Sequence, residues 1–193
     1  MNSLSPIFHL RFAWALLAVL VGIATLAQRT PAQAPTPTTI RAVLRPASER
    51  KPAPEFALKD DQSRTITLKN YRGKVVLLDF WATWCHGCKE EIPGFSELQT
   101  KYRAQGLEVV GIAMDDEGWK VMKPFLAATK VSYRMLAGDQ RTFQSYGLQA
   151  LPDTFLIDGQ GRIAAAYVGG LVNENDIESN VKSLLIEKWK TGP

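Results

Sequence analysis

Residues 74–82, KVVLLDFWA, form a nearly uninterrupted apolar run that leads directly into a Cys-x-x-Cys pair. A run of this kind, bounded by Gly73, is typical of a strand that is buried on both faces of a sheet. Cys85 and Cys88 are the only cysteines among the 193 residues. The sequence therefore places both sulfur groups where a buried strand passes into the next element.

Strands and helices alternate along the rest of the chain. In chain order, we expect a hairpin at 56–68, the buried strand at 74–82, a helix to about 104, a second buried strand at 107–114, a helix at 119–129, a short strand at 133–138, a short helix at 141–148, a hairpin at 154–170 and a C-terminal helix capped by Asn173. This order predicts an α/β fold, with a mixed sheet covered by helices on both faces.

The junction between strand and helix gives the two cysteines different chemistry. At the start of a helix, free N–H groups and the helix dipole stabilise a thiolate, here that of Cys85. Cys88 lies one turn further on and is expected to be more buried. Thiol–disulfide exchange needs an attacking thiol and a neighbouring resolving thiol.

Two other interpretations of the pair are weaker. A structural zinc site needs four ligands, and the only histidines are His9 and His86. A purely structural disulfide across so short a loop would restrain little of the unfolded chain.

The motif WATWCHGC after VVLLDF resembles the thioredoxin superfamily, and more closely its exported TlpA/ResA-like branch. The similarity covers most of residues 54–190, including PEFALKDDQSRTITLKNYRGK and LPDTFLIDGQGRI. It implies a thioredoxin-like three-layer α/β/α fold with a central mixed β-sheet, an N-terminal β-hairpin and an added helix after the second core strand. It also implies a redox-active disulfide, with Cys85 as nucleophile and Cys88 as resolving thiol.

The resemblance also implies residues that bind substrate. Pro152 matches the family's cis-proline, with an ordinary trans proline as the alternative, and the backbone of Leu151 would pair with a substrate strand. Trp84 matches a Trp that flanks the active site, with core packing as the alternative. His86-Gly87 replaces the commoner Gly-Pro or Glu-Pro. A protonated His86 would favour the thiolate and a more oxidising protein, and an exposed bystander is the alternative.

Two carboxyl groups are candidates for proton transfer. Asp79 lies within the buried strand, where a carboxylate is costly unless it is useful or paired. We expect Asp79 to have a raised pKa and to exchange a proton with Cys88. The alternative is a structural role in which water satisfies the hydrogen bonds of the carboxyl group. Glu91 matches a Glu near the site of ResA-like members, with a solvated helix carboxylate as the alternative.

Pro93 matches a helix kink of the family and is expected to be structural.

The N-terminal part is expected to direct export. Residues 1–27 contain an apolar run at 12–27, read either as a cleaved signal peptide or as a membrane anchor. Residues 28–53 form a Pro-rich basic linker, followed by the thioredoxin-like domain at 54–193. The net charge of +4 arises before residue 54, so no nucleic-acid partner is expected.

These features predict an exported thiol–disulfide oxidoreductase on the extracytoplasmic side, anchored by residues 12–27. The resemblance to the TlpA/ResA-like branch implies that it reduces disulfides in exported proteins, for example in cytochrome c maturation, and we expect a monomer that is supplied by a membrane electron donor. We expect no cofactor and no bound metal. The alternatives are a disulfide oxidant or isomerase, a copper-delivery protein, which would use two soft thiolates, and a non-catalytic binding module. A peroxiredoxin would need a Pro-x-x-x-Thr-x-x-Cys loop, which is absent here.

Overall fold

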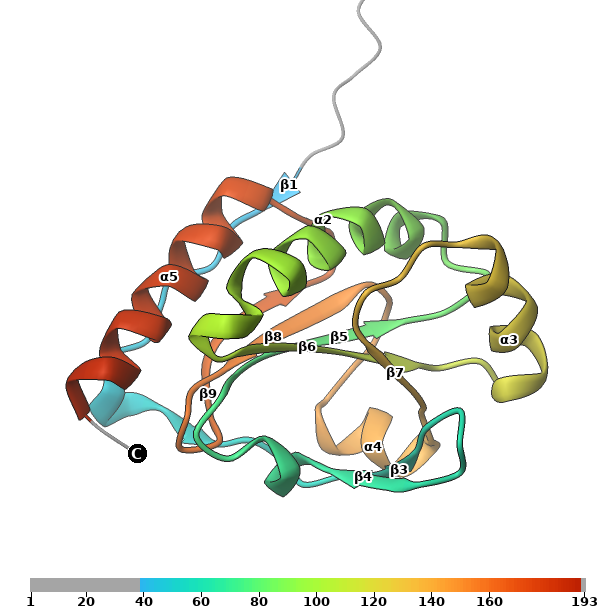
Figure 1. Ribbon diagram of the computed structural model, residues 1–193, viewed down its shortest axis with the longest axis horizontal. Coiled ribbons are helices and arrows are strands. Elements are labelled where there is room, and N and C mark those ends of the chain that lie inside the picture. The colour runs from blue at the N-terminus through green and yellow to red at the C-terminus, as the bar shows by residue number, and fades with distance from the viewer. Residues whose placement is uncertain (1–38, 192–193) are drawn as a thin grey trace, which may run out of the picture. The chain divides into compact units, whose positions relative to one another are not determined.

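The computed structural model describes residues 39–191 (Figure 1). The strands are β1 (Thr39–Ile40), β2 (Lys51–Pro52), β3 (Ala57–Lys59), β4 (Thr65–Thr67), β5 (Val75–Trp81), β6 (Leu107–Ala113), β7 (Arg134–Ala137), β8 (Asp153–Ile157), β9 (Arg162–Val168) and β10 (Leu171–Val172). The helices are α2 (His86–Tyr102), α3 (Trp119–Ala128), α4 (Gln140–Ser145) and α5 (Glu174–Thr191), with short 3-10 helices η1 (Ala47–Glu49), η2 (Leu68–Tyr71) and η3 (Arg103–Gln105).

The main sheet has eight strands in the order β2-β9-β8-β5-β6-β7-β3-β4. β5, β6 and β7 run parallel, whereas β8 pairs antiparallel with β5, and β9 with β8. β5 lies at the centre, and all seven of its residues are buried. The cysteine motif therefore follows the most enclosed strand of the sheet.

Helices cover both faces of this sheet (Figure 1). One core lies between the sheet and α2, α3 and α5, and the other lies between the sheet, α4 and the β3–β4 hairpin. Alternate residues of β5 enter the two cores, since successive side chains of a strand point to opposite faces. The predicted three-layer fold is confirmed, including the hairpin and the added helix α3.

A segment that we call the N-terminal strap, residues 39–53, packs along this domain. β1 pairs in parallel with β10, and β2 pairs antiparallel with β9 at the edge of the main sheet. Between them, Ala42 N–H donates to Asp176 Oδ2 at 3.1 Å, and the Asn180 amide donates to the Ala42 carbonyl at 2.9 Å. The prediction placed residues 28–53 in a linker, but the described part of that segment is held against the domain.

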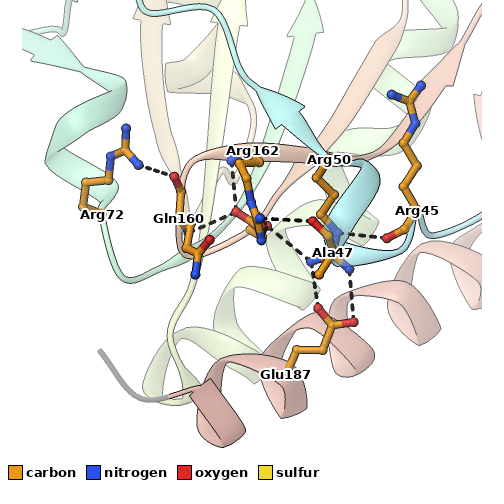
Figure 2. Close-up of polar contacts among 8 residues, drawn as sticks. Arg45, Ala47, Arg50, Arg72, Gln160, Arg162 and Glu187 are labelled. Carbon is orange, nitrogen blue, oxygen red and sulfur yellow. Dashed lines mark hydrogen bonds and ion pairs between the residues drawn. The ribbon is translucent and has the colours of Figure 1, made fainter.

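Arg50 anchors the strap in a buried ion-pair network (Figure 2). Its side chain is 2% exposed, and Nη1 lies 2.7 Å from Glu187 Oε2 on α5 and 3.3 Å from Asp158 Oδ2 in the β8–β9 turn. Its Nε donates to the Arg45 carbonyl at 2.9 Å, and Arg162 pairs with the same Asp158 carboxylate at 2.7 Å. Buried charges are tolerated where each has a partner, so the network ties the strap to α5 and to the sheet.

No helix among residues 39–191 combines the length and the apolar character that a membrane span requires. The signal or anchor predicted within residues 1–27, and the beginning of the predicted linker, lie outside the described residues.

Candidate active site

The two cysteines form a disulfide at the start of α2. Cys85 is the N-cap residue, and its sulfur accepts a hydrogen bond from Cys88 N–H at 3.2 Å. Cys85 is 7% exposed and Cys88 is fully buried, so Cys85 is the more accessible of the two sulfurs, as expected. The N-terminal end of a helix stabilises negative charge, which favours a thiolate at Cys85 once the bond is reduced.

Asp115 holds the loop that leads from β5 to this disulfide. Its carboxylate accepts from Thr83 N–H at 3.0 Å and from the Thr83 hydroxyl at 2.5 Å. Asp115 is itself buried, and it follows the carboxyl end of β6. Asp115 is not among the predicted site residues, although an acidic pair, Asp115-Asp116, directly follows the second buried strand in the sequence.

The loop before β8 lies directly against the cysteine motif. The Leu151–Pro152 peptide bond is cis, as the resemblance implied. A methyl group placed on Gly87 would lie 3.8 Å from Pro152 Cδ and 3.1 Å from Leu171 Cδ2. Gly87 thus leaves room for β10 to approach the turn between the cysteines.

Trp84 directly precedes Cys85 in the chain and is 69% exposed, so the alternative of core packing is wrong. It lines a hollow of about 430 Å³ together with Met114, Asp116, Phe143 and Leu151. The hollow places the predicted substrate residues Trp84 and Leu151 on one surface. Their role in substrate binding stays a prediction.

His86 is the first residue of α2. Its side chain is 89% exposed, and Nε2 lies 3.3 Å from Glu90 Oε1. The Glu90 carboxylate is therefore the group that would pair with a positive charge on His86, and an ion pair this exposed is screened by solvent. The predicted effect of His86 on the thiolate stays a prediction.

Asp79 and Glu91 are both buried near the disulfide. Asp79 is 0% exposed and shares its face of β5 with Leu77 and Trp81, which belong to the same core as Cys88. Burial raises the pKa of Asp79 well above its usual range, the charge of Glu91 raises it further, and the Tyr133 hydroxyl opposes the shift. The expected raised pKa of Asp79 therefore has a physical cause in the fold.

Glu91 is 7% exposed, so the alternative of a solvated helix carboxylate is wrong. Its Oε1 accepts from Val172 N–H of β10 at 2.6 Å. Burial raises the pKa of Glu91 to about 7; the Val172 N–H opposes this shift, while the charges of Glu90 and Asp153 add to it. Glu91 therefore changes its charge near neutral pH.

We expect Glu91→Gln to stabilise the protein at alkaline pH. A carboxyl group whose pKa rises on folding, here from 4.5 to about 7, lowers the free energy of unfolding as the pH rises through that interval. Glutamine keeps an acceptor for Val172 N–H but carries no charge. Above pH 7, the free energy of unfolding should therefore increase by about 2 kcal/mol, measured by urea unfolding as a function of pH.

The exposed Glu97 on the same helix provides a matched control, and Glu97→Gln should leave this pH dependence unchanged. Equal unfolding curves for the parent and Glu91→Gln at alkaline pH would contradict the assignment.

The fold and the paired cysteines at a strand-to-helix junction define a thioredoxin-like thiol–disulfide oxidoreductase. A sequence model of the AhpC/TSA family matches residues 50–166, and the chain belongs to this family. The chain is 35% identical, over 133 residues, to thiol-disulfide oxidoreductase ResA of Geobacillus thermodenitrificans. The aligned region covers 68% of this chain and 75% of that protein. It is 32% identical over 123 residues to ResA of Bacillus subtilis, covering 63% of this chain and 68% of that protein.

Solved structures agree with this assignment. A putative thiol:disulfide interchange protein DsbE from Chlorobium tepidum superposes with a TM-score of 0.66 at 28% identity, covering 77% of this chain and 99% of that chain. A secreted thiol-disulfide isomerase from Corynebacterium glutamicum has a TM-score of 0.68 at 21% identity, covering 80% and 97%, and shows the shared fold. The predicted resemblance to the thioredoxin superfamily and the predicted enzyme class, a protein-disulfide reductase, are confirmed.

Proposed function

We propose that the protein acts outside the cytoplasm and reduces disulfides in exported proteins, with apocytochrome c among the candidates. The main support for the proposal is that the same chain contains this disulfide site and an apolar run at residues 12–27. The similarity to proteins named thiol-disulfide oxidoreductase ResA supports the thiol–disulfide chemistry of this proposal. A membrane electron donor would return the pair to its reduced state.

The proposed reaction begins at Cys85. Its thiolate attacks a substrate disulfide, giving a mixed disulfide and one released substrate thiolate. Cys88 then loses its proton and attacks Cys85, which forms the intramolecular disulfide and releases the second substrate thiolate. Asp79 takes the proton from Cys88, and Glu91 supplies a second group that titrates near neutral pH. Trp84, His86, Leu151 and Pro152 form the surface that receives the substrate strand.

A direct test compares two oxidised peptides. One carries Cys-x-x-Cys-His, the haem attachment motif, and the other carries the same residues in scrambled order. The proposal expects the reduced full chain to reduce the first peptide faster. Equal rates for the two peptides would remove the preference for cytochrome substrates.

The redox midpoint tests the direction of electron flow. We expect a value near or below about −250 mV, measured by Trp fluorescence in defined glutathione or dithiothreitol couples. A value near about −120 to −180 mV would instead identify an oxidant or isomerase.

We expect Asp79→Asn to slow the release of the mixed disulfide by about 10- to 100-fold near neutral pH, because the amide cannot accept the Cys88 proton. Rapid-mixing measurements that separate attack from release provide the readout, and attack by Cys85 should keep its rate. Exchange kinetics that remain unchanged across pH would refute the role of Asp79.

A further inference from the structure

Six residues at one face of the sheet carry buried polar atoms that have no hydrogen-bond partner among the described residues. These atoms are both carboxyl oxygens of Asp79, Nε1 of Trp81, Oε2 of Glu91, Oγ of Ser96, the hydroxyl of Tyr133 and Oγ1 of Thr154. Buried polar groups are normally paired, and exceptions often belong to functional sites. Neither Tyr133 nor Thr154 has a part in the reaction described above.

The register of the sheet explains why these groups meet. Asp79 lies opposite Thr154 on β8 and opposite Gly111 on β6. Gly111 has no side chain, and a methyl group there would collide with Met135 Sδ and lie 3.1 Å from Trp81 Nε1. The space beside Asp79 is therefore filled from β7 and from Trp81. Tyr133 lies two residues before Met135, and both belong to the core that contains Cys88.

Tyr133 is buried in the same core as Cys88, and both buried carboxyl groups act on its hydroxyl. Its hydroxyl interacts with the Asp79 carboxyl, and the charges of Asp79 and Glu91 both act on it. Burial and these two charges raise the pKa of Tyr133 well above its usual range, so its hydroxyl keeps its proton and can act as a donor. The contact does not meet hydrogen-bond geometry while the cysteines are joined, and such contacts often tighten as a reaction proceeds.

We propose that Tyr133 is a positioning residue for thiol–disulfide exchange: its hydroxyl donates a hydrogen bond to the ionised carboxylate of Asp79, and so keeps this carboxylate available to accept the Cys88 proton. The inference rests on the role proposed above for Asp79. In the release step, the Cys88 S–H bond breaks and its proton passes to Asp79. The Cys88 sulfur bonds to the Cys85 sulfur, and the bond between Cys85 and the substrate sulfur breaks. The substrate leaves as a thiolate with the electron pair of that bond.

The expected effect of Tyr133 follows from the charges around Asp79. Burial and Glu91 both favour the protonated carboxylic acid, and Glu90 and Asp153 act on Glu91 in turn. The Tyr133 hydroxyl opposes them. Its removal should therefore leave less ionised Asp79 at a given pH, and the pH midpoint of the release step should rise.

The test uses the reduced full chain and the chromogenic disulfide dithiobis-nitrobenzoate. Attack by Cys85 frees one coloured thiolate, and release by Cys88 frees the second, so the two steps appear as two phases. For Tyr133→Phe we expect the midpoint of the second phase to rise by about one pH unit, with about tenfold slower release below the midpoint. The first phase should be unchanged.

Tyr71→Phe is the matched control, because it also removes a buried hydroxyl without a partner among the described residues, but one that packs against the opposite core. It should leave both phases unchanged. An unshifted midpoint in Tyr133→Phe would overturn the inference and leave the reductase function intact, provided that Asp79→Asn abolishes the pH dependence. If the release phase of Asp79→Asn keeps its pH midpoint, the inference and the role of Asp79 are both overturned. The same holds if Glu91→Gln, and not Asp79→Asn, removes the pH dependence of that phase.

Discussion

A Cys88→Ser variant is expected to accumulate as a covalent mixed disulfide with its substrate and to lose measurable turnover. Cys85 is the more accessible sulfur at the start of α2, so it still attacks. The serine hydroxyl is not acidic enough to act as a thiolate would, and no second cysteine exists in the chain to release the substrate. Non-reducing electrophoresis and intact mass spectrometry, after mixing with an oxidised Cys-x-x-Cys-His peptide, would detect the adduct.

Cys85→Ser is the control for this experiment and should give no adduct. Its remaining sulfur, Cys88, is fully buried and cannot reach a protein substrate. An adduct that forms through Cys88 in the Cys85→Ser variant would reverse the assignment of the attacking and resolving cysteines.

Removal of the N-terminal strap should destabilise the domain by about 3–5 kcal/mol. A fragment that begins at Thr39 retains the strap, whereas one that begins at Pro54 lacks it. The loss has two sources. Apolar side chains of the strap, namely Ile40, Ala42 and Leu44, no longer cover the core on the side of α5. The guanidinium of Arg50 no longer pairs with Asp158 and Glu187.

Urea unfolding of the two fragments would measure this difference, with the disulfide intact in both. Arg50→Met in the longer fragment separates the two sources, because it keeps an apolar side chain and removes the guanidinium with its ion pairs and its hydrogen bond to the Arg45 carbonyl. We expect Arg50→Met to lower the free energy of unfolding by less than complete removal of the strap, since Arg162 still pairs with Asp158. Equal stability of the two fragments would show that the strap contributes nothing and that the domain begins near residue 54.

Elements with local signals agree closely between sequence and structure. β5 occupies Val75–Trp81 within the apolar run at 74–82, and β6 occupies Leu107–Ala113 within the run at 107–114. The cap of α5 is also as expected, because Asn173 Oδ1 accepts from Asp176 N–H at 3.1 Å. Each of these features depends on residues that are neighbours in the chain, and such interactions leave a readable pattern.

The strap had no such signal. Its strands are two residues long, and its remaining contacts are single hydrogen bonds and one buried arginine. The partners of Ala42 and Arg50 on α5 are more than 100 positions away along the chain. Composition therefore indicated a Pro-rich linker, whereas burial against α5 and β9 decided its conformation.

The groups that carry out the chemistry can be read from the sequence: two cysteines at a strand-to-helix junction, a carboxyl group within the buried strand and a proline that completes the motif. The environment of these groups depends on contacts that form only in the folded protein. The fold buried Glu91 under β10, anchored the cysteine loop on Asp115, and brought Tyr133 beside Asp79. The physical reason is that burial and charge act through space, and the residues that supply them come from distant strands.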